Sequence, residues 1–179
     1  MRRIVKWAER EYPIIVRILG TLAAGVLFVI LIPLFITVAG PALDRFLSIS
    51  LPLVDPWVLV IGIFFMLVGG FFALWSIVDQ LFKARGTPLP IMPTQELLIS
   101  GPFKLCRNPM SFGTILLYLG LSILIVSPGA AAIVIVLSSL LLTYIKRVEE
   151  RELEARFGQA YRSYKEQTPF LIPRKFGGS

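Results

Sequence analysis

Histidine is absent from this sequence of 179 residues, and cysteine occurs once, as Cys106. The absence of histidine excludes a histidine general base, a Ser-His-Asp triad, and any metal or haem held by imidazole. A single cysteine excludes a disulfide within the sequence, and we expect Cys106 to be a small buried residue rather than a reactive thiol. Acidic residues number 11, and only the stretch 149–154 gathers several of them, so we predict no metal site.

Charged residues are also scarce, at 16% of the chain, whereas hydrophobic residues make up 56% and the mean hydropathy is +0.79. The apolar residues gather in runs of about 20, which is long enough to cross a bilayer. The composition therefore predicts an integral membrane protein with a single membrane domain over residues 1–179. The net charge of +7 predicts membrane orientation rather than nucleic-acid binding, because no stripe of Lys and Arg with interleaved aromatic residues is present.

The hydropathy pattern predicts an all-α membrane protein with four transmembrane helices, of which the last two form a hairpin about Pro128. The long loop before the hairpin is too rich in proline for a continuous helix. The predicted segments are a basic interfacial head (1–17), the first two spans (within 18–78), a loop (79–108), and the hairpin with its tail (109–179). The first two spans cover 18–39 and 57–78 and are joined by a loop from Gly40 to Pro56. The spans of the hairpin cover 109–126 and 130–144, and the last helix continues to Phe157.

Two further expectations concern the first span and the orientation. Pro33 predicts a kink, which membrane helices tolerate. A signal peptide cleaved after Ala39 is an alternative, although the apolar run is too long for one. The head, the long loop and the tail hold nearly all Lys and Arg, so we predict that both termini, the loop and the tail face the cytoplasm, at the inner membrane if the source is bacterial.

The hairpin brings two charged groups to one level. A helix is predicted to begin at Asn108-Pro109, because asparagine is a favourable N-cap and proline suits the first helical turn. The asparagine lies 20 residues before Pro128, and Glu149 lies 21 residues after it. At about 1.5 Å per residue, both points lie about 30 Å from the turn. Arg107, at a helix N-terminus suited to anions, should therefore lie level with Glu149 and Glu150.

A ligand with a carboxylate at one end and cationic groups at the other fits between such sites, and S-adenosylmethionine is one such ligand. The alternative is that these residues are ordinary interfacial charges, with i,i+4 pairs from Lys146 to Glu150 and from Glu152 to Arg156. Three aromatic residues are either the lining of an adenine pocket or members of an interfacial aromatic belt: Phe103, Phe112 and Tyr144.

Three blocks of the C-terminal half are similar to a known family. The first runs from Gly86-Thr87-Pro88-Leu89-Pro90 through Leu97 to Phe103, the second is Arg107-Asn108-Pro109-Met110, and the third runs from Arg147 to Leu153, followed by Phe157-Gly158, Tyr161, Tyr164 and Pro173. In this order on a membrane hairpin, they resemble the integral-membrane methyltransferases grouped around isoprenylcysteine carboxyl methyltransferase and the phospholipid (phosphatidylethanolamine) N-methyltransferases. The second block matches the family's Arg-(His/Asn)-Pro core.

The resemblance implies that S-adenosylmethionine binds at the cytoplasmic end of the last two spans, under the loop and the tail. Glu149 and Glu150 match the family's paired glutamates, one of which holds the ammonium group of the cofactor. Ser111 and Phe103 stand where the family commonly has tyrosine, so the acceptor side of the pocket should differ. Arg107 and Glu150 are the predicted catalytic residues. The predicted cofactor-binding residues are Gly101, Pro102, Phe103, Arg107, Asn108, Pro109, Tyr144, Glu149 and Glu150.

The sequence therefore predicts an S-adenosylmethionine-dependent methyltransferase that acts on a lipid-like or small hydrophobic acceptor arriving from the bilayer. Methyl transfer needs alignment and a dry pocket more than proton transfer, so the lack of histidine is no obstacle. The alternatives are an NADPH-dependent enzyme resembling the membrane sterol reductases and a non-catalytic membrane scaffold of the same fold. The expected partners are the lipid bilayer and the acceptor; no nucleic acid is expected, and the sequence indicates no protein partner.

Overall fold

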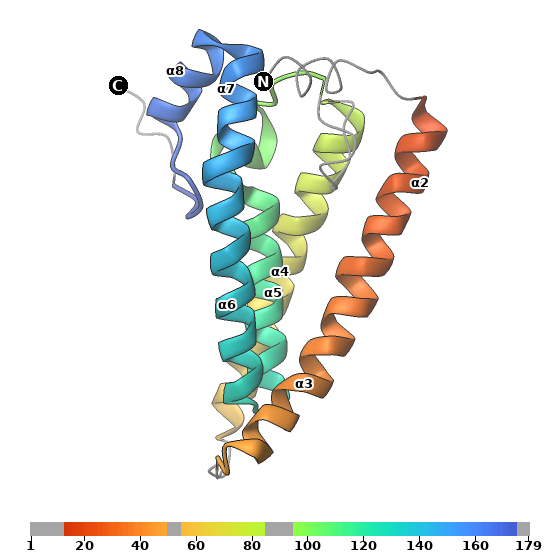
Figure 1. Cartoon of the computed structure of the whole chain (residues 1–179), viewed down its shortest axis with the longest axis vertical. Helices are drawn as coiled ribbons and strands as arrows, with labels where there is room; N and C mark the ends of the chain where they lie inside the picture. The colour runs from red at the N-terminus through yellow and green to blue at the C-terminus, as the bar shows by residue number, and fades with distance from the viewer. Residues whose placement is uncertain (1–12, 50–54, 85–94, 175–179) are drawn as a thin grey trace.

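The computed structural model describes residues 13–49, 55–84 and 95–174, and every regular element in these ranges is helical (Figure 1). The predicted all-α class is thereby confirmed. The elements are α2 (Ile14–Gly25), a π-helical segment η1 (Val26–Leu31), α3 (Ile32–Phe46), α4 (Pro56–Phe82), a 3₁₀ turn η2 (Gly101–Lys104), α5 (Pro109–Leu124), α6 (Pro128–Tyr144), a second π-helical segment η3 (Ile145–Glu149), α7 (Glu150–Phe157) and α8 (Gln159–Gln167). Residues 1–12 of the predicted head and residues 86–94 of the first block lie outside the described ranges.

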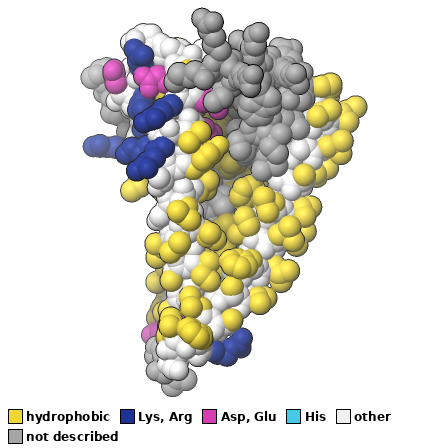
Figure 2. All heavy atoms as spheres, viewed as in Figure 1, with side chains coloured by type: hydrophobic (Ala, Val, Ile, Leu, Met, Phe, Trp, Pro, Cys, Tyr) yellow, Lys and Arg dark blue, Asp and Glu magenta, His cyan; other side chains and the backbone are white. Residues whose placement is uncertain are grey.

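Three continuous helical stretches among the described residues are long and apolar enough to cross a membrane: Ile14–Phe46, Pro56–Phe82 and Pro128–Phe157. The helix α5 is also apolar, but its 16 residues extend only about 24 Å, against about 30 Å of hydrocarbon. Length therefore confirms three of the four predicted spans and gives the third predicted span as a shorter apolar helix. The hydrophobic side chains that cover the visible faces of the long helices fit a bilayer environment (Figure 2).

The predicted loop from Gly40 to Pro56 is wrong in its first part, because α3 continues through Pro41 to Phe46. A buried polar contact holds this extension in place. Asp44, which is 4% exposed, accepts hydrogen bonds from the Ser127 hydroxyl and from the Gly129 N–H, the latter at 2.6 Å. Tertiary contacts with the α5–α6 turn thus override the local tendency of proline to end a helix.

Pro33 is accommodated by a widening of the helix just before it. The π-helical segment η1 ends at Leu31, and the N–H of Ile32 bonds to the carbonyl of Leu27, five residues earlier. A proline ring clashes with the carbonyl four residues before it and donates no hydrogen bond. The structure thus has a π-helical segment directly before Pro33, and the kink there stays a prediction.

The helices α4 and α5 form the most extensive helix pair of the described chain, and glycine makes their contact close. A Cβ atom at Gly69 would lie 2.4 Å from the backbone nitrogen of Leu117 and 2.5 Å from the carbonyl oxygen of Gly113. At the neighbouring Gly70, the nearest atom would be 3.7 Å away, in the side chain of Leu117. Of these two glycines, only Gly69 lies at a backbone-to-backbone contact, which holds the middle of α4 against the first half of α5.

A small buried core links the first helical stretch to the hairpin. It contains Ile36, Tyr118, Ala130 and Val134. The Tyr118 hydroxyl also donates a 2.5 Å hydrogen bond to the carbonyl of Phe28 in η1. Toward its N-terminus, α2 leans away from α4 and α6, so that the bundle is wider at the end that carries α7 and α8 (Figure 1).

Candidate functional site

Arg107 lies between η2 and the start of α5, on a backbone held by the C-terminal tail. Its N–H donates to the carbonyl of Pro169 at 2.9 Å, and the N–H of Arg174 donates to the carbonyl of Leu105 at 3.0 Å. Asn108 precedes α5 as predicted, but its side chain makes no capping hydrogen bond. Its amide donates instead to the carbonyl of Phe170, at 2.9 Å. The asparagine thus fastens the tail to the start of α5.

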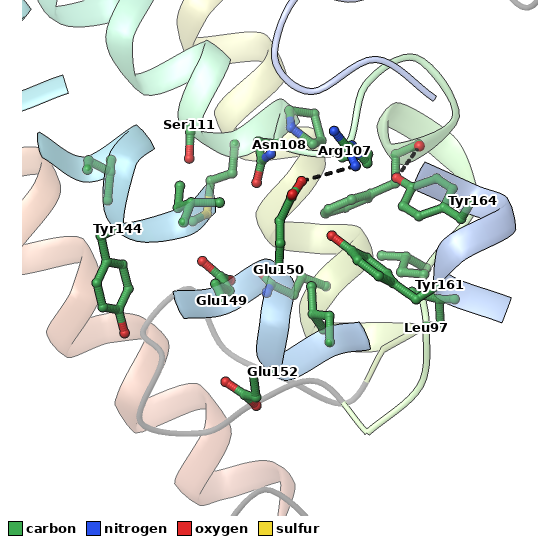
Figure 3. Close-up of a pocket in the computed structure, with 18 of the residues that line it drawn as sticks. Leu97, Arg107, Asn108, Ser111, Tyr144, Glu149, Glu150, Glu152, Tyr161 and Tyr164 are labelled. Carbon is green, nitrogen blue, oxygen red and sulfur yellow. Dashed lines mark hydrogen bonds and ion pairs between the residues drawn. The ribbon is translucent and has the colours of Figure 1, made fainter. Parts of the chain in front are cut away.

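Glu150 approaches Arg107 from the other arm of the hairpin (Figure 3). The Arg107 Nη1 and Glu150 Oε1 atoms are 3.1 Å apart, and Lys165 Nζ of α8 lies 3.1 Å from Glu150 Oε2. The side chains of Arg107 and Glu150 are 11% and 3% exposed. The predicted common level of these two residues is therefore confirmed.

The π-helical segment η3 explains which glutamate turns inward. Ile145 and Glu150 are both buried, at 5% and 3% exposure, and they are five residues apart, as the wider π turn allows. In a regular α-helix, Glu149 would follow Ile145 on that face. The predicted Lys146–Glu150 pair is not among the ion pairs of the described residues, and the Lys146 ammonium lies over the Phe170 ring instead. The predicted Glu152–Arg156 pair is present, at 3.3 Å.

Hydrogen bonding leaves part of this buried charge pair unsatisfied. The contact between Arg107 and Glu150 has the distance of an ion pair without the alignment of a hydrogen bond. Within the described residues, Arg107 Nε, Arg107 Nη1 and Glu150 Oε1 have no hydrogen-bond partner. Buried polar atoms without partners are costly, and at such a position they are well suited to receive a ligand.

A cavity of about 210 Å³ opens beside this pair. A single water molecule needs roughly 10–15 Å³ of such space, so the cavity has room for an organic molecule. Its lining comes from α4 to α8 and from η1: Phe28, Gln80, Leu97, Leu98, Phe103, Arg107, Asn108, Pro109, Met110, Ser111, Thr114, Leu141, Tyr144, Ile145, Glu149, Glu150, Glu152, Leu153, Arg156, Tyr161 and Tyr164.

Seven of the nine predicted cofactor-binding residues line this cavity, and the other two do not. Gly101 is not part of the lining; its φ is +57°, and a Cβ there would collide with the Asp79 carboxylate. Pro102 is fully buried and is not part of the lining. Of the three predicted aromatic residues, Phe103 and Tyr144 line the cavity, whereas Phe112 packs edge-on against Phe72 with ring centroids 5.2 Å apart.

The charged groups of the lining are arginines and glutamates. It holds two arginines against three glutamates, which gives −1 when all five groups are ionised. Arg107 pairs with Glu150, and Arg156 pairs with Glu152. Glu149 has no ion pair within the described part of the chain. The cavity therefore favours a ligand with net positive charge that also has an acceptor group for the Arg107 N–H groups.

Two tyrosines of α8 complete the wall that faces Arg107. The Tyr164 hydroxyl donates a 2.6 Å hydrogen bond to the carbonyl of Phe103, and the Tyr161 hydroxyl points toward Glu150 (Figure 3). Burial, followed by the charge of Glu150, raises the pKa of Tyr161, and burial is also the main cause that raises the pKa of Tyr164. Both phenols therefore stay protonated at neutral pH.

The predicted site residues do not include these tyrosines or Lys165, although both tyrosines belong to the third block and Tyr161 also carries a helical signal. Tyr161 continues the i+4 series of Glu149, Leu153 and Phe157. A helical face that begins with a predicted site residue predicts that Tyr161 lies on the same side. Lys165 lies on α8, after the break at Gly158, and no pattern in the chain indicates that α8 returns to Glu150.

Cys106 is fully buried, as predicted, and burial raises the pKa of its thiol to about 11. A neutral, inaccessible thiol is a poor nucleophile. Ser111, which stands where a tyrosine was expected from the resemblance, lines the cavity with its small hydroxyl.

The fold and the cavity define a helical membrane protein with a pocket near one end of its hairpin that is lined by two arginines and three glutamates. Residues 57–160 match the family model described as phospholipid methyltransferase, which is more than half of the chain. The chain belongs to the phospholipid methyltransferase family, and it is a membrane methyltransferase in kind. The match includes Arg107, Glu149 and Glu150 but ends just before Tyr161. Comparison with curated proteins and with solved structures gave no match.

Proposed function

We propose that this protein transfers a methyl group from S-adenosylmethionine to a lipophilic acceptor at the membrane interface. The observation that carries the proposal is the buried Arg107 guanidinium, which lines the cavity with two N–H-bearing nitrogens that have no hydrogen-bond partner among the described residues. Across the cavity, Glu149 supplies a carboxylate without an ion pair in the same part of the chain. A cation and an anion facing one small space suit an amino acid-like ligand.

The lining fits the charges of this cofactor. In the proposed arrangement, Arg107 holds the α-carboxylate, Glu149 offsets the positive charge of the ammonium and sulfonium groups, and Phe103 and Tyr144 offer aromatic surface to the adenine. With all five charged groups of the lining ionised, its net charge of −1 complements the net +1 of the bound molecule. When bound, S-adenosylmethionine supplies an electrophilic methyl group on its sulfonium.

The contribution of the chain is to align the two reactants and to exclude water. Displacement at a methyl group depends on alignment and a dry site more than on proton transfer. The tail holds the backbone of Arg107 through Pro169, and the Tyr164 hydroxyl holds η2 through Phe103. Glu150 is buried with Arg107 on one oxygen and Lys165 on the other, so we assign it the role of a positioning residue for Arg107 rather than a catalytic role.

The charges also favour one chemistry of acceptor. Both arginines of the lining already face glutamates, so the cavity offers no further cation to hold an acceptor carboxylate. An uncharged or cationic nucleophile, such as the amine of a lipid headgroup, is compatible with the lining. The apolar lining residues Phe28 and Leu141 suit the hydrophobic part of such a lipid. We further propose that this end of the bundle faces the cytoplasm, because the Lys- and Arg-rich segments gather there.

The same charges argue against NADPH. Its several phosphate charges would enter a lining that holds three glutamates against two arginines, each of which has an acidic neighbour. One observation favours the alternative of a non-catalytic scaffold: Ser111 and Phe103 stand where the methyltransferase family commonly has tyrosine. Measurement of methyl transfer separates a scaffold from an enzyme.

The test incubates the purified protein in detergent with methyl-labelled S-adenosylmethionine and a total lipid extract. We expect label in a lipid product. Arg107→Ala should lower the rate of methyl transfer at least about tenfold, because it removes the group that holds the α-carboxylate of S-adenosylmethionine. Arg162→Ala is the matched control, since Arg162 pairs with Glu154 away from the cavity, at 2.8 Å. Absence of labelled lipid with the folded wild-type protein, or equal rates for both variants, would overturn the proposal.

A further inference from the structure

Three basic residues occur where α6 passes into α7, on a surface that the cavity does not use. Lys146, Arg147 and Arg151 are exposed, and none of them lines the cavity. We call these three residues the basic band. Figure 2 shows Lys and Arg side chains gathered near this end of the molecule, directly beyond hydrophobic side chains. The band therefore marks a change from apolar to cationic surface along one helical stretch.

The apolar surface below the band has the spacing of one helical face. Its members are at positions i, i+1 and i+4 of α6 and are exposed: Val136 at 58%, Leu137 at 43% and Leu140 at 64%. These residues belong to the stretch Pro128–Phe157, which is long and apolar enough to cross a membrane. The exposed face is therefore in contact with lipid chains, and the band lies where this helix leaves the hydrocarbon.

The two arginines of the band have no acidic partner within the described part of the chain. Arg147 lies in η3 and Arg151 in α7, on one continuous helical stretch. The three nearest glutamates that form ion pairs are already engaged: Glu150 with Arg107 and Lys165, Glu152 with Arg156, and Glu154 with Arg162. Glu149, which has no ion pair among the described residues, lines the cavity, so the two arginines can take an anion from outside the chain.

We propose that the basic band binds the headgroup phosphates of anionic phospholipids in the surrounding bilayer. A guanidinium group can bind a phosphate through two parallel hydrogen bonds, and lipid phosphates lie at the depth where an apolar helix face ends. The acyl chains of the same lipid lie against the exposed face below. A free phosphate ion or an acidic soluble protein lacks this apolar part. The site is separate from the cavity, so lipid binding here does not require methyl transfer.

The experiment counts lipids bound to the detergent-purified protein by native mass spectrometry, with phosphatidylglycerol and phosphatidylcholine titrated separately. The wild-type protein should bind phosphatidylglycerol more tightly than phosphatidylcholine. The double variant Arg147→Gln with Arg151→Gln should weaken phosphatidylglycerol binding by about five- to twenty-five-fold, because each arginine near a charged lipid surface contributes about fivefold to the affinity. Binding of phosphatidylcholine should not change. Inorganic phosphate at the same concentration should not displace the lipid.

Two controls keep the test decisive. Arg45→Gln removes an exposed arginine in the last turn of α3, at the end of the bundle opposite to the band (Figure 1), and should leave phosphatidylglycerol binding unchanged. The combination of Arg147→Lys with Arg151→Lys retains the charge and should retain most of the binding. The proposal is overturned if the glutamine double variant, folded as judged by its melting temperature, binds phosphatidylglycerol like the wild type. It is also overturned if Arg45→Gln weakens binding equally, or if phosphate alone displaces the lipid.

Discussion

At the scale of single residues, the adjacent glutamates of η3 and α7 differ in their partners. Glu150 is buried between Arg107 and Lys165, whereas Glu149 lines the cavity without an ion pair among the described residues. The sequence does not distinguish the two glutamates, and we predicted Glu150 as a catalytic residue. The π-helical segment η3 determines which of the two side chains turns inward to Arg107. Nothing in the residue pattern predicts a π-helical segment at this point.

The first prediction concerns the charge of Glu149. Glu149→Gln should weaken S-adenosylmethionine binding about five- to tenfold and S-adenosylhomocysteine binding less, because only the former carries the sulfonium charge. The affinities are measured by calorimetric titration of each ligand into the same preparation. Glu166→Gln, an exposed position on α8, is the control. Equal losses for both ligands would show that Glu149 does not respond to the sulfonium.

The second prediction concerns Cys106. With a thiol pKa of about 11, about one molecule in a thousand carries a thiolate at pH 8, and the residue is fully buried as well. Maleimide labelling of the folded protein should therefore be much slower than labelling in denaturing detergent, and it should rise only as the pH approaches 11. Labelling of the folded protein at the rate of a free thiol would contradict both the burial and the raised pKa.

At the scale of elements, α4 and α5 meet at a close backbone contact, and both helices contribute residues to the cavity lining. The sequence contains the pair Gly69-Gly70, which permits a close helix contact without indicating which glycine makes it. The fold selects Gly69, which faces the backbone of α5, while Gly70 has ordinary space around it. The hairpin length was predictable from hydropathy and the turn residues, but the helical face of α4 that meets α5 was not.

The third prediction compares the two glycines. Gly69→Ala should lower the free energy of unfolding by about 1–3 kcal/mol, because the new methyl group would overlap the backbone of α5. Gly70→Ala should change it by less than about 0.5 kcal/mol. Thermal unfolding in detergent measures both variants against the wild type. If the two substitutions have the same effect, the close contact at Gly69 is not present in the protein.

At the scale of the whole molecule, hydropathy and charge predicted the membrane class, the hairpin and the common level of Arg107 and Glu150. These follow from helix rise and from the cost of burying charge in lipid, which act along the chain. The continuation of α3 through Pro41 and the return of the tail to Asn108 depend on contacts between distant segments. Local patterns carry no information about such contacts, so these parts of the fold required the structure.

The family membership and the cavity together make one claim central: Arg107 and the glutamates of the other hairpin arm hold one small molecule of net positive charge or its neutral product. Calorimetric titration of the purified protein with S-adenosylhomocysteine, and with NADPH as the competing ligand, tests this claim most directly. The account predicts saturable heat with one S-adenosylhomocysteine per chain and no heat with NADPH. Saturable heat with NADPH and none with S-adenosylhomocysteine would contradict it.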